Sequence, residues 1–431
     1  MAATSNLRMG RQIWVPISAT ILPITLALSG CGNPQRAATA TSAQPATTTT
    51  TTGQSREPLV GVAAAVMRDA KGVAAFDANG VPLAGGALPG LPIGDWSEVV
   101  TAAPSGAATR LAWIDVRTRS EHASQMLPVA GVIPVLASPD GHLVALQPPP
   151  ESPLDPADIA PSRERTRIVV ARLGASEPVR TFDLSGNFVA EGFSSGGDTV
   201  YLIQYEPAIH PRKYRVRALT TATGDVTSLV TREKQPNDEE MEGRSRTQVF
   251  EPANKILFTL YSQPAASGPH AFVHTLGVDG GWVHCIDLPD PLGLGGAPAA
   301  ITTSPDGSAL FVAGAGHLLE ISTQELTITR TADIGQIGEH PSVAATRTRI
   351  AVGSGRTLVI LDRSTLKADR LVDLGATITG VTAVPNAVDS VLVALAGALL
   401  QVDLATGKVV ARVPLPTGLT QLLGLRAIPV T

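Results

Sequence analysis

The sequence predicts an all-β domain over most of its length, a β-propeller built from four-stranded blades. Three observations indicate this fold. From Pro58 onward, short apolar runs alternate with turns rich in Gly, Asp, Asn and Pro. No long stretch has the 3.6-residue apolar period of an amphipathic helix. A unit of four such runs recurs at about 40 residues, which is the repeat length of propeller blades.

The first 30 residues form a separate segment with the pattern of an export signal. A basic start is followed by the apolar run Ile13–Leu28, which Pro16 and Pro23 interrupt. This run is too short and too broken for a comfortable membrane span. It ends in Leu28-Ser29-Gly30-Cys31, which resembles the lipobox of bacterial lipoprotein signal peptides. The resemblance implies cleavage before Cys31 and a diacylglycerol on its thiol. We therefore expect a lipid-anchored protein of the cell membrane that faces the extracytoplasmic side.

Residues 31–57 follow as a linker. Ala37–Gln54 is rich in Ala, Thr, Pro and Ser, and Thr47–Thr52 is an unbroken run of threonine. Such a segment has no apolar period and cannot bury a core, so we expect a disordered tether. The threonines fit a plain spacer or sites of O-glycosylation, and the sequence leaves both open.

The propeller domain is expected over residues 58–431. Its clearest repeat spans Ile378–Leu415, and its four expected strands are Ile378–Val384, Ser390–Leu395, Leu399–Asp403 and Lys408–Leu415. A second copy spans Ala299–Ile334. Its first turn is Ser304-Pro305-Asp306-Gly307, and the same tetrad stands at Ser138–Gly141. Equivalent first turns are placed at Pro104, Gly196, Asn254 and Thr348.

Four segments lengthen the interval between repeats. Each lies between recognisable strands, so we interpret them as inserted loops and not as extra blades; they are Pro148–Arg165, Glu206–Arg212, Glu233–Arg246 and Ser262–Pro269.

The two ends of the domain are expected to form one blade together. Leu59–Met67, Gly72–Asp77 and Val81–Ala84 are expected as three strands, and Leu419–Pro429 as the strand that closes the ring. Strict counting gives eight blades. However, Glu98–Gly131 is short for four strands, and its strands could belong to the same blade as the N-terminal unit. We therefore expect seven blades, with eight as the alternative.

These repeats resemble those of YVTN-type and WD40-like bacterial propellers. The resemblance is carried by the Ser-Pro-Asp-Gly tetrads and by Val402–Val410, with weaker echoes at Thr220–Gly224 and Ile360–Asp362. These residues are typical of tight turns, because Asp and Ser side chains hydrogen-bond to the local backbone and Gly adopts a positive φ without strain. The family includes lactonases, quinoproteins, lyases and pure scaffolds, and the fold does not choose among them.

Composition excludes some classes of function. The formal net charge of −4 is mild and gives no electrostatic footprint for nucleic acid. There are two cysteines; if Cys31 is lipidated, Cys285 has no disulfide partner. We interpret Cys285 as a buried small side chain. Aromatic residues make up 4% of the chain, which argues mildly against carbohydrate and quinone sites. Trp96, Trp113 and Trp282 are interpreted as blade packing.

No motif for catalysis survives inspection. Gly192-Phe193-Ser194-Ser195-Gly196 matches the hydrolase nucleophile pattern, but a strand pattern follows it where that motif needs a helix. His274 and His284 lie on consecutive expected strands, yet no third metal ligand is placed by sequence. His317 and His340 lie near expected strand ends, where a central funnel could gather them. We expect no catalytic, cofactor-binding or metal-ligating residue and no cofactor.

Two charged segments receive structural interpretations. The acidic run Asp238–Glu242 lacks the spacing of calcium loops and is expected to be a solvated loop. Arg212–Arg217 alternates basic and apolar residues, as does a strand with one wet face. Binding of an anionic envelope component is the alternative for this second segment.

The sequence therefore favours a binding or scaffold module for an envelope protein or ligand over an enzyme. The alternative is a lactonase- or lyase-type enzyme with its site in the central funnel, and a quinone or metal cofactor protein comes third. If the inserted loops Pro148–Arg165 and Glu233–Arg246 share a face, that face is the expected binding surface, because binding residues concentrate on loops held by rigid scaffolds.

Overall fold

The computed structural model describes residues 48–50, 57–83, 87–93, 96–151, 154–155, 157–174, 180–262, 270–294, 298–335, 338 and 340–427. The chain divides into two units, Met1–Pro45 and Ala46–Thr431, and the description below concerns the second. The expected signal segment and Cys31 lie outside the described residues. Within the described part, no helix has the length and apolar character needed to span a membrane.

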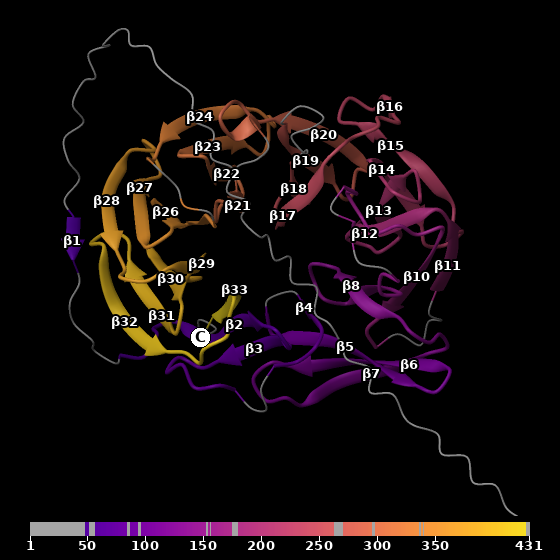
Figure 1. Cartoon of the computed structure of the whole chain (residues 1–431), viewed down its shortest axis with the longest axis horizontal. Coiled ribbons are helices and arrows are strands. Elements are labelled where there is room, and N and C mark those ends of the chain that lie inside the picture. Colours follow the sequence, from indigo (N-terminus) through magenta and orange to yellow (C-terminus); the bar gives the residue numbers. More distant parts are fainter. Residues whose placement is uncertain are drawn as a thin grey trace, which may run out of the picture. The chain divides into compact units, whose positions relative to one another are not determined.

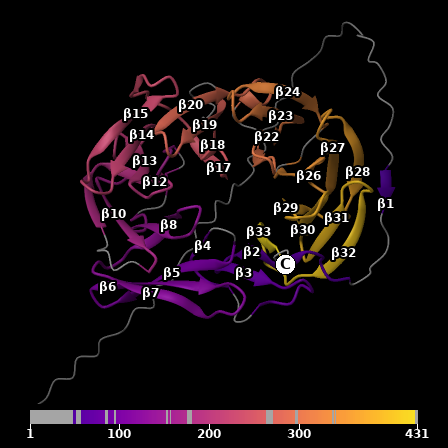
Figure 2. The same cartoon turned by 180° about the vertical axis from the view of Figure 1, so that it is seen from behind.

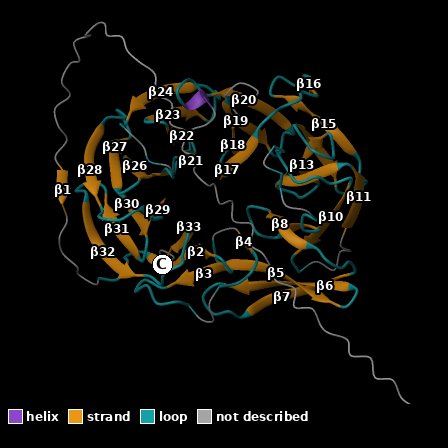
Figure 3. Ribbon diagram, in the orientation of Figure 1, coloured by secondary structure: helices purple, strands orange, loops and turns teal. Residues whose placement is uncertain are grey.

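The described strands form eight antiparallel units, each of three or four strands, which we number as blades 1–8 in chain order (Figures 1 and 3). From the innermost strand outward, blade 1 contains β33 (Gln421–Ala427), β2 (Val62–Asp69) and β3 (Gly72–Phe76), and blade 2 contains β4 (Leu91–Ile93), β5 (Glu98–Ser105), β6 (Ala108–Asp115) and β7 (Glu121–Leu127). Blade 3 contains β8 (Ile133–Ala137), β9 (Leu143–Gln147), β10 (Arg165–Arg172) and β11 (Arg180–Ser185). Blade 4 contains β12 (Asn187–Phe193), β13 (Thr199–Glu206), β14 (Lys213–Thr220) and β15 (Val226–Thr231).

Blades 5–8 repeat this order. Blade 5 contains β17 (Arg244–Glu251), β18 (Ile256–Ser262), β19 (Ala271–Gly277) and β20 (Trp282–Asp287), and blade 6 contains β21 (Ala299–Thr303), β22 (Ala309–Gly314), β23 (His317–Ser322) and β24 (Ile328–Asp333). Blade 7 contains β25 (Ser342–Ala345), β26 (Arg349–Ser354), β27 (Thr357–Asp362) and β28 (Ala368–Asp373). Blade 8 contains β29 (Ile378–Ala383), β30 (Ser390–Leu395), β31 (Ala398–Asp403) and β32 (Lys408–Pro414). The strand limits of blade 8 agree with the sequence expectation to within one residue.

Successive blades are adjacent in space. Innermost strands touch in the pairs β4 and β8, β8 and β12, β17 and β21, β21 and β25, β25 and β29, and β29 and β33. Blades 4 and 5 are joined in addition at their outer edges, where β15 and β20 pair in parallel. The same cyclic order is visible from both sides in Figures 1 and 2.

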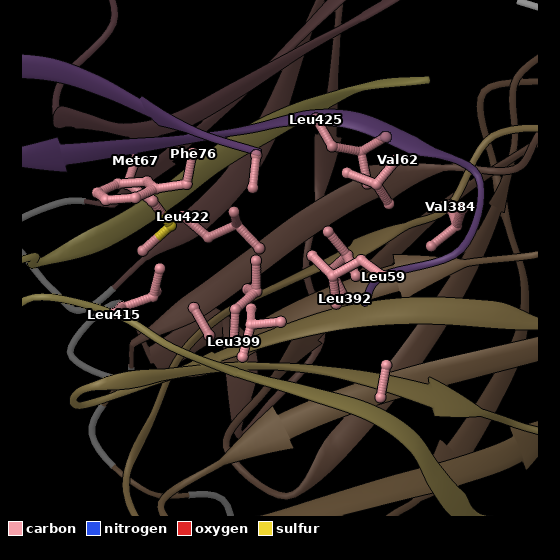
Figure 4. Packing of buried hydrophobic residues seen from close by; sticks show 14 of the residues in the cluster. Leu59, Val62, Met67, Phe76, Val384, Leu392, Leu399, Leu415, Leu422 and Leu425 are labelled. Carbon is pink, nitrogen blue, oxygen red and sulfur yellow. The ribbon is translucent and has the colours of Figure 1, made fainter. Parts of the chain in front are cut away.

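The two ends of the domain meet in blade 1, as expected from the sequence. Strand β33 pairs antiparallel with β2, with Leu425 opposite Ala65. Figure 4 shows the apolar cluster at this junction, where Leu422 and Leu425 lie with Met67 of β2 and Leu399 of blade 8. The segment expected as a further strand at Val81–Ala84 makes only an isolated bridge, between Pro82 and Phe76, and Ala84 lies outside the described residues.

The blade count expected from the sequence is not confirmed: the described strands form seven sheets, and we number eight blades because the nine-stranded sheet contains both blade 4 and blade 5. Strands β4–β7 make a sheet of their own, separate from β3-β2-β33. Strand β4 was not predicted from the sequence, because it is three residues long and stands in a Gly/Pro-rich stretch that obscures its pattern. Pro104 was also misplaced: it lies inside β5 and not in a first turn.

The two Ser-Pro-Asp-Gly tetrads form the same turn, as their residues predict. In each, the serine hydroxyl donates to the aspartate, at 2.5 Å from Ser138 to Asp140 and 2.6 Å from Ser304 to Asp306. The serine Oγ also accepts the backbone N–H that opens the next strand. Gly141 and Gly307 have φ values of 73° and 69°, which explains why glycine ends the tetrad.

The tether is not wholly without regular structure. Thr48–Thr50 form β1, which pairs in parallel with β28. Strand β28 is the outer strand of blade 7, so its free edge offers backbone groups to an extended segment, and β-branched threonine suits that conformation. The other residues of the expected tether, apart from Glu57, lie outside the described residues.

We expect Asp306→Asn to cost more stability at neutral than at acid pH. Burial would raise the pKa of Asp306, but hydrogen bonds from Ser304, Arg363 and Ser308 outweigh it and hold this pKa well below its usual range. The stabilisation is therefore fully present above the unfolded pKa of about 4 and declines as the pH falls toward the folded pKa. Solvent screening of the half-exposed carboxylate limits the effect to about 1 kcal/mol. Urea midpoints of both proteins at pH 7 and pH 3 measure it, and equal losses at both pH values would contradict the prediction.

Candidate functional site

The alternation of strand direction sorts the connections of the domain onto two faces. Turns between first and second strands, and between third and fourth strands, lie on one face, which we call the tight-turn face. Turns between second and third strands, and the connections from one blade to the next, lie on the other, which we call the insertion face. All four expected insertions fall on the insertion face, within blades 3–5. Residues 263–269 of the last one lie outside the described residues.

The inserted loops contact one another directly. The Ile159 N–H donates to the Pro211 carbonyl at 3.1 Å, and the Arg163 N–H donates to the Ala208 carbonyl at 3.0 Å. From the third loop, Arg244 Nη2 donates to the Asp158 carbonyl at 2.5 Å. The loops Pro148–Arg165 and Glu233–Arg246 therefore share a face, which is the condition that the sequence analysis set for a binding surface.

Asp158 is the residue that ties the loops together. Its side chain is 2% exposed, and its Oδ2 lies 3.0 Å from His210 Nδ1, while Oδ1 lies 3.5 Å from Arg212 Nη2. Asp155, Asp158 and His210 together offer ligand atoms that lie within 4.8 Å of one another. In the described part of the chain, they are the only group of three His, Cys, Asp or Glu residues close enough to hold one metal ion. The guanidinium of Arg212 already balances the buried carboxylate, so we interpret the trio as a structural clasp.

The two charged segments of the sequence are partners of each other. From β14, Lys213 pairs with Glu240 at 2.5 Å, and Arg215 pairs with Glu240 at 3.0 Å. Arg217 pairs with Asp238. The interpretation of Arg212–Arg217 as largely a strand is confirmed, since β14 covers Lys213–Thr220. Because these cations are occupied, the segment offers little free charge to an anionic ligand.

Exposed aliphatic side chains stand on the insertion face. Leu154 and Ile209 are each 41% exposed, and Leu294, in the connection from blade 5 to blade 6, is 47% exposed. Leu154 and Ile209 lie in loops, and Leu294 ends a short 3-10 helix, Leu292–Leu294. With the ionic groups paired among themselves, these side chains are the apolar contacts that the face offers to a partner.

Beneath the loops, the interface between blades 4 and 5 buries titratable groups. All four tyrosines of the chain belong to its apolar cluster, and the rings of Tyr214 and Tyr261 stack at 4.9 Å. Glu191 of β12 accepts hydrogen bonds from Thr259 Oγ1 at 2.9 Å and Gln248 Nε2 at 3.3 Å. Burial raises the pKa of Glu191, and these hydrogen bonds offset only part of that rise.

The histidine pair considered in the sequence analysis is not brought together as a site. His274 lies opposite Cys285 in the sheet, and His284 lies opposite Thr275, so the two histidines point to opposite faces of blade 5. Burial, with a smaller contribution from His284, lowers the pKa of His274 to about 4. Burial also raises the pKa of Cys285 to about 12, so its thiol is neutral. The sequence predicts a buried side chain at Cys285, and the structure places it as partly buried.

The remaining sequence candidates have structural roles. Ser194 ends a strand and its hydroxyl donates to the Thr199 carbonyl at the start of β13, so a strand follows where a nucleophile would need a helix. Trp113 is buried and its Nε1 donates to the Gly141 carbonyl at 3.4 Å. His317 opens β23, while His340 is exposed in the loop before β25.

A cleft lies on the tight-turn face, between blades 6 and 7. It is a polar cleft of about 680 Å³, lined by Glu320, Arg330, Arg347, Asp362 and Arg363 among others. Arg330 pairs with Glu320, and Arg363 pairs with Asp306 at 2.8 Å. The guanidinium groups of Arg330 and Arg363 are thus paired with carboxylates within the protein. The cleft was missed in the sequence because its walls come from separate repeats.

Comparison with solved structures supports the fold. The dihydro-heme d1 dehydrogenase NirN, in complex with DHE, matches with a TM-score of 0.50 at 14% identity, over 85% of this chain and 76% of that one. This domain is a β-propeller. Sqt1 from Saccharomyces cerevisiae matches at 0.46 and 12% identity, over 75% and 84% of the two chains. BamB from Moraxella catarrhalis matches at 0.41 and 14%, over 78% and 89%. No protein-family model and no curated protein sequence matches this propeller chain. The likenesses therefore concern the fold alone.

Proposed function

We propose that this chain is a lipid-anchored, extracytoplasmic lipoprotein whose propeller binds or scaffolds an envelope protein or ligand through its insertion face. The observation that carries the proposal is the clasp around Asp158, which joins loops of neighbouring blades into one surface. A rigid scaffold that holds joined loops is the usual arrangement of a binding site.

The character of this surface favours a protein partner over a charged small ligand. Its cations and anions pair with each other, as Arg217 does with Asp238, and Leu154 and Ile209 remain exposed beside them. Exposed aliphatic side chains rimmed by polar groups are typical of protein-protein contacts. The trio of Asp155, Asp158 and His210 stands in these loops and not on an innermost strand, so it gives no support to an enzyme site in the funnel.

The anchor is tested by Cys31→Ala. If Cys31 carries the lipid, this variant is expected to move almost completely from the membrane fraction to the soluble fraction of fractionated cells. Cys285→Ala is the matched control, because it removes the other cysteine and leaves the anchor, and it should stay with the membranes. Retention of Cys31→Ala in the membrane fraction would refute the lipoprotein proposal.

The binding face is tested by site-specific photo-crosslinking in cells of the anchored protein. A photoreactive residue at Ile209 on the insertion face is expected to give a discrete crosslinked band. The same residue at Val388, which is 58% exposed in the first turn of blade 8, is the control on the tight-turn face. A second substitution, Leu154→Glu, should weaken the band at Ile209. Equal bands from both positions, or none from Ile209, would count against this surface.

A further inference from the structure

A polar row crosses blade 5 on the side that faces blade 4. Thr259 is paired with Gln248 on one side and His274 on the other, and His274 is paired in turn with Cys285. Residues directly opposite each other in a sheet project from the same face, with Cβ atoms about 4.5–5.5 Å apart. Gln248 and Thr259 hydrogen-bond to Glu191 of blade 4. The outer half of the row, His274 and Cys285, has no such partner across the interface.

The imidazole of His274 is the anomaly in this row. The residue is 1% exposed, and neither ring nitrogen has a hydrogen-bond partner among the residues that the structure describes. A buried neutral imidazole has one donor and one acceptor to satisfy, and leaving both unpaired costs free energy. Buried polar atoms are paired in the great majority of cases, and an exception is commonly explained by a bound ion or water.

Two sulfur atoms lie on the same side of the blade. Cys285 Sγ is 3.8 Å from Met241 Sδ. Met241 belongs to the inserted loop Glu233–Arg246 and is held in place by reciprocal backbone hydrogen bonds with Tyr214, at 2.8 and 2.9 Å. A separation of 3.8 Å suits two sulfur ligands that bind one metal ion at about 2.3 Å each. His274 and Cys285 are thus neighbours across the sheet, and the thioether of Met241, from a separate segment, lies beside the Cys285 thiol.

We propose that His274, Cys285 and Met241 form a binding site for a soft metal ion, and that Cu(I) is the ion it selects. Thiolate and thioether ligands select Cu(I), and imidazole also binds copper. On binding, the S–H bond of Cys285 breaks, a sulfur–copper bond forms and the proton leaves to solvent; no electron is transferred. The part of Cys285 that remains accessible provides the path from solvent. The carboxylate of Glu191, which would suit a harder cation, is engaged by Thr259 and Gln248.

The site would couple the insertion loop to the sheet beneath it. Met241 belongs to the inserted loop, whereas His274 and Cys285 belong to the sheet of blade 5. The metal proposal does not depend on the proposed function, because its residues differ from those at the loop surface.

The test is a metal titration of the full-length chain, with Cys31→Ser in every sample so that Cys285 is the sole cysteine. Cu(I) is titrated without oxygen against a chromogenic Cu(I) chelator, and Ag(I) serves as a probe that does not change oxidation state. We expect one equivalent to bind. Cys285→Ser should abolish this binding, and Met241→Leu and His274→Leu should each weaken it at least tenfold.

Matched controls separate ligand loss from general damage. His284→Gln changes the neighbouring histidine on the opposite face, and Met67→Leu changes a buried methionine of blade 1; both should bind as the parent does. Cooperative thermal unfolding of each apo variant confirms its fold, and Met241→Leu decides the matter if His274→Leu does not fold. Binding that is lost in Cys285→Ser but unchanged in Met241→Leu would indicate a lone thiol and overturn the proposal. Binding by the parent no tighter than by Cys285→Ser would overturn it as well.

Discussion

A chain that ends at Thr420 is expected to lose cooperative folding. This truncation removes β33, the strand that pairs with β2 and forms the innermost strand of blade 1. It also removes Leu422 and Leu425, which are 8% and 6% exposed and pack at the junction of blades 1 and 8 (Figure 4). Loss of each buried leucine costs about 2–5 kcal/mol, and a domain has about 5–15 kcal/mol in total.

Size-exclusion chromatography and thermal unfolding measure this effect. A chain that ends at Ala427 keeps all of β33 and is the matched control; it should unfold cooperatively like the full chain. Supplying residues 420–431 as a peptide should restore part of the folded population, because closure is then made by a separate chain. A cooperative transition in the Thr420 truncation near the full-length midpoint would show that β33 is not needed to close the ring.

Glu191→Gln is expected to stabilise the domain at pH 8 and to change its stability little at pH 4. Because burial raises the pKa of Glu191 in the folded state, the folded chain keeps a proton that the unfolded chain releases above pH about 4.3. The stability of the parent therefore falls as the pH rises from the unfolded pKa to the folded pKa, and stays constant above it. Glutamine does not ionise, so the stability of the variant does not decrease over this pH range.

Because the raised pKa of Glu191 lowers the stability of the parent at high pH, we expect a higher Tm for the variant at pH 8, by the few degrees typical of a single substitution. Thermal unfolding of the parent and Glu191→Gln at pH 4 and pH 8 gives the comparison. Glu325→Gln, in an exposed turn of blade 6, is the control and should shift neither midpoint. A lower Tm for Glu191→Gln at pH 8 would mean that the ionised carboxylate is needed in this interface.

Much of the fold was predictable because its determinants are local. The four strands of Ile378–Leu415 were placed to within one residue, since alternating apolar residues between Asp, Asn and Gly turns mark each limit. The Ser304–Gly307 turn follows from side chains that bind their own backbone. Strand β4 was not predicted, because it has only three residues, too few to show an alternating pattern.

The candidate site was predictable only in outline. The inserted loops were recognised from their Pro-rich and charged composition, and their common face was stated as a condition. The contacts that join them were not visible: Asp158 and His210 are separated by 52 positions, and nothing local in either loop indicates the other. Charge complementarity could have suggested that Arg212–Arg217 pairs with Asp238–Glu242. It does not show which basic side chain pairs with which acidic one.

The sequence by itself determined the strand pattern, the turns and the closing role of the last strand, because each depends on residues near one another or on a regular repeat. It also contains the lipobox-like segment, whose role stays a prediction. Only the tertiary structure decided that the inserted loops join on one face, that His274 lies opposite Cys285 in the sheet, and that Met241 lies beside Cys285. The physical reason is that these depend on register between strands and on packing between blades, which are set by the whole ring and not by any one segment.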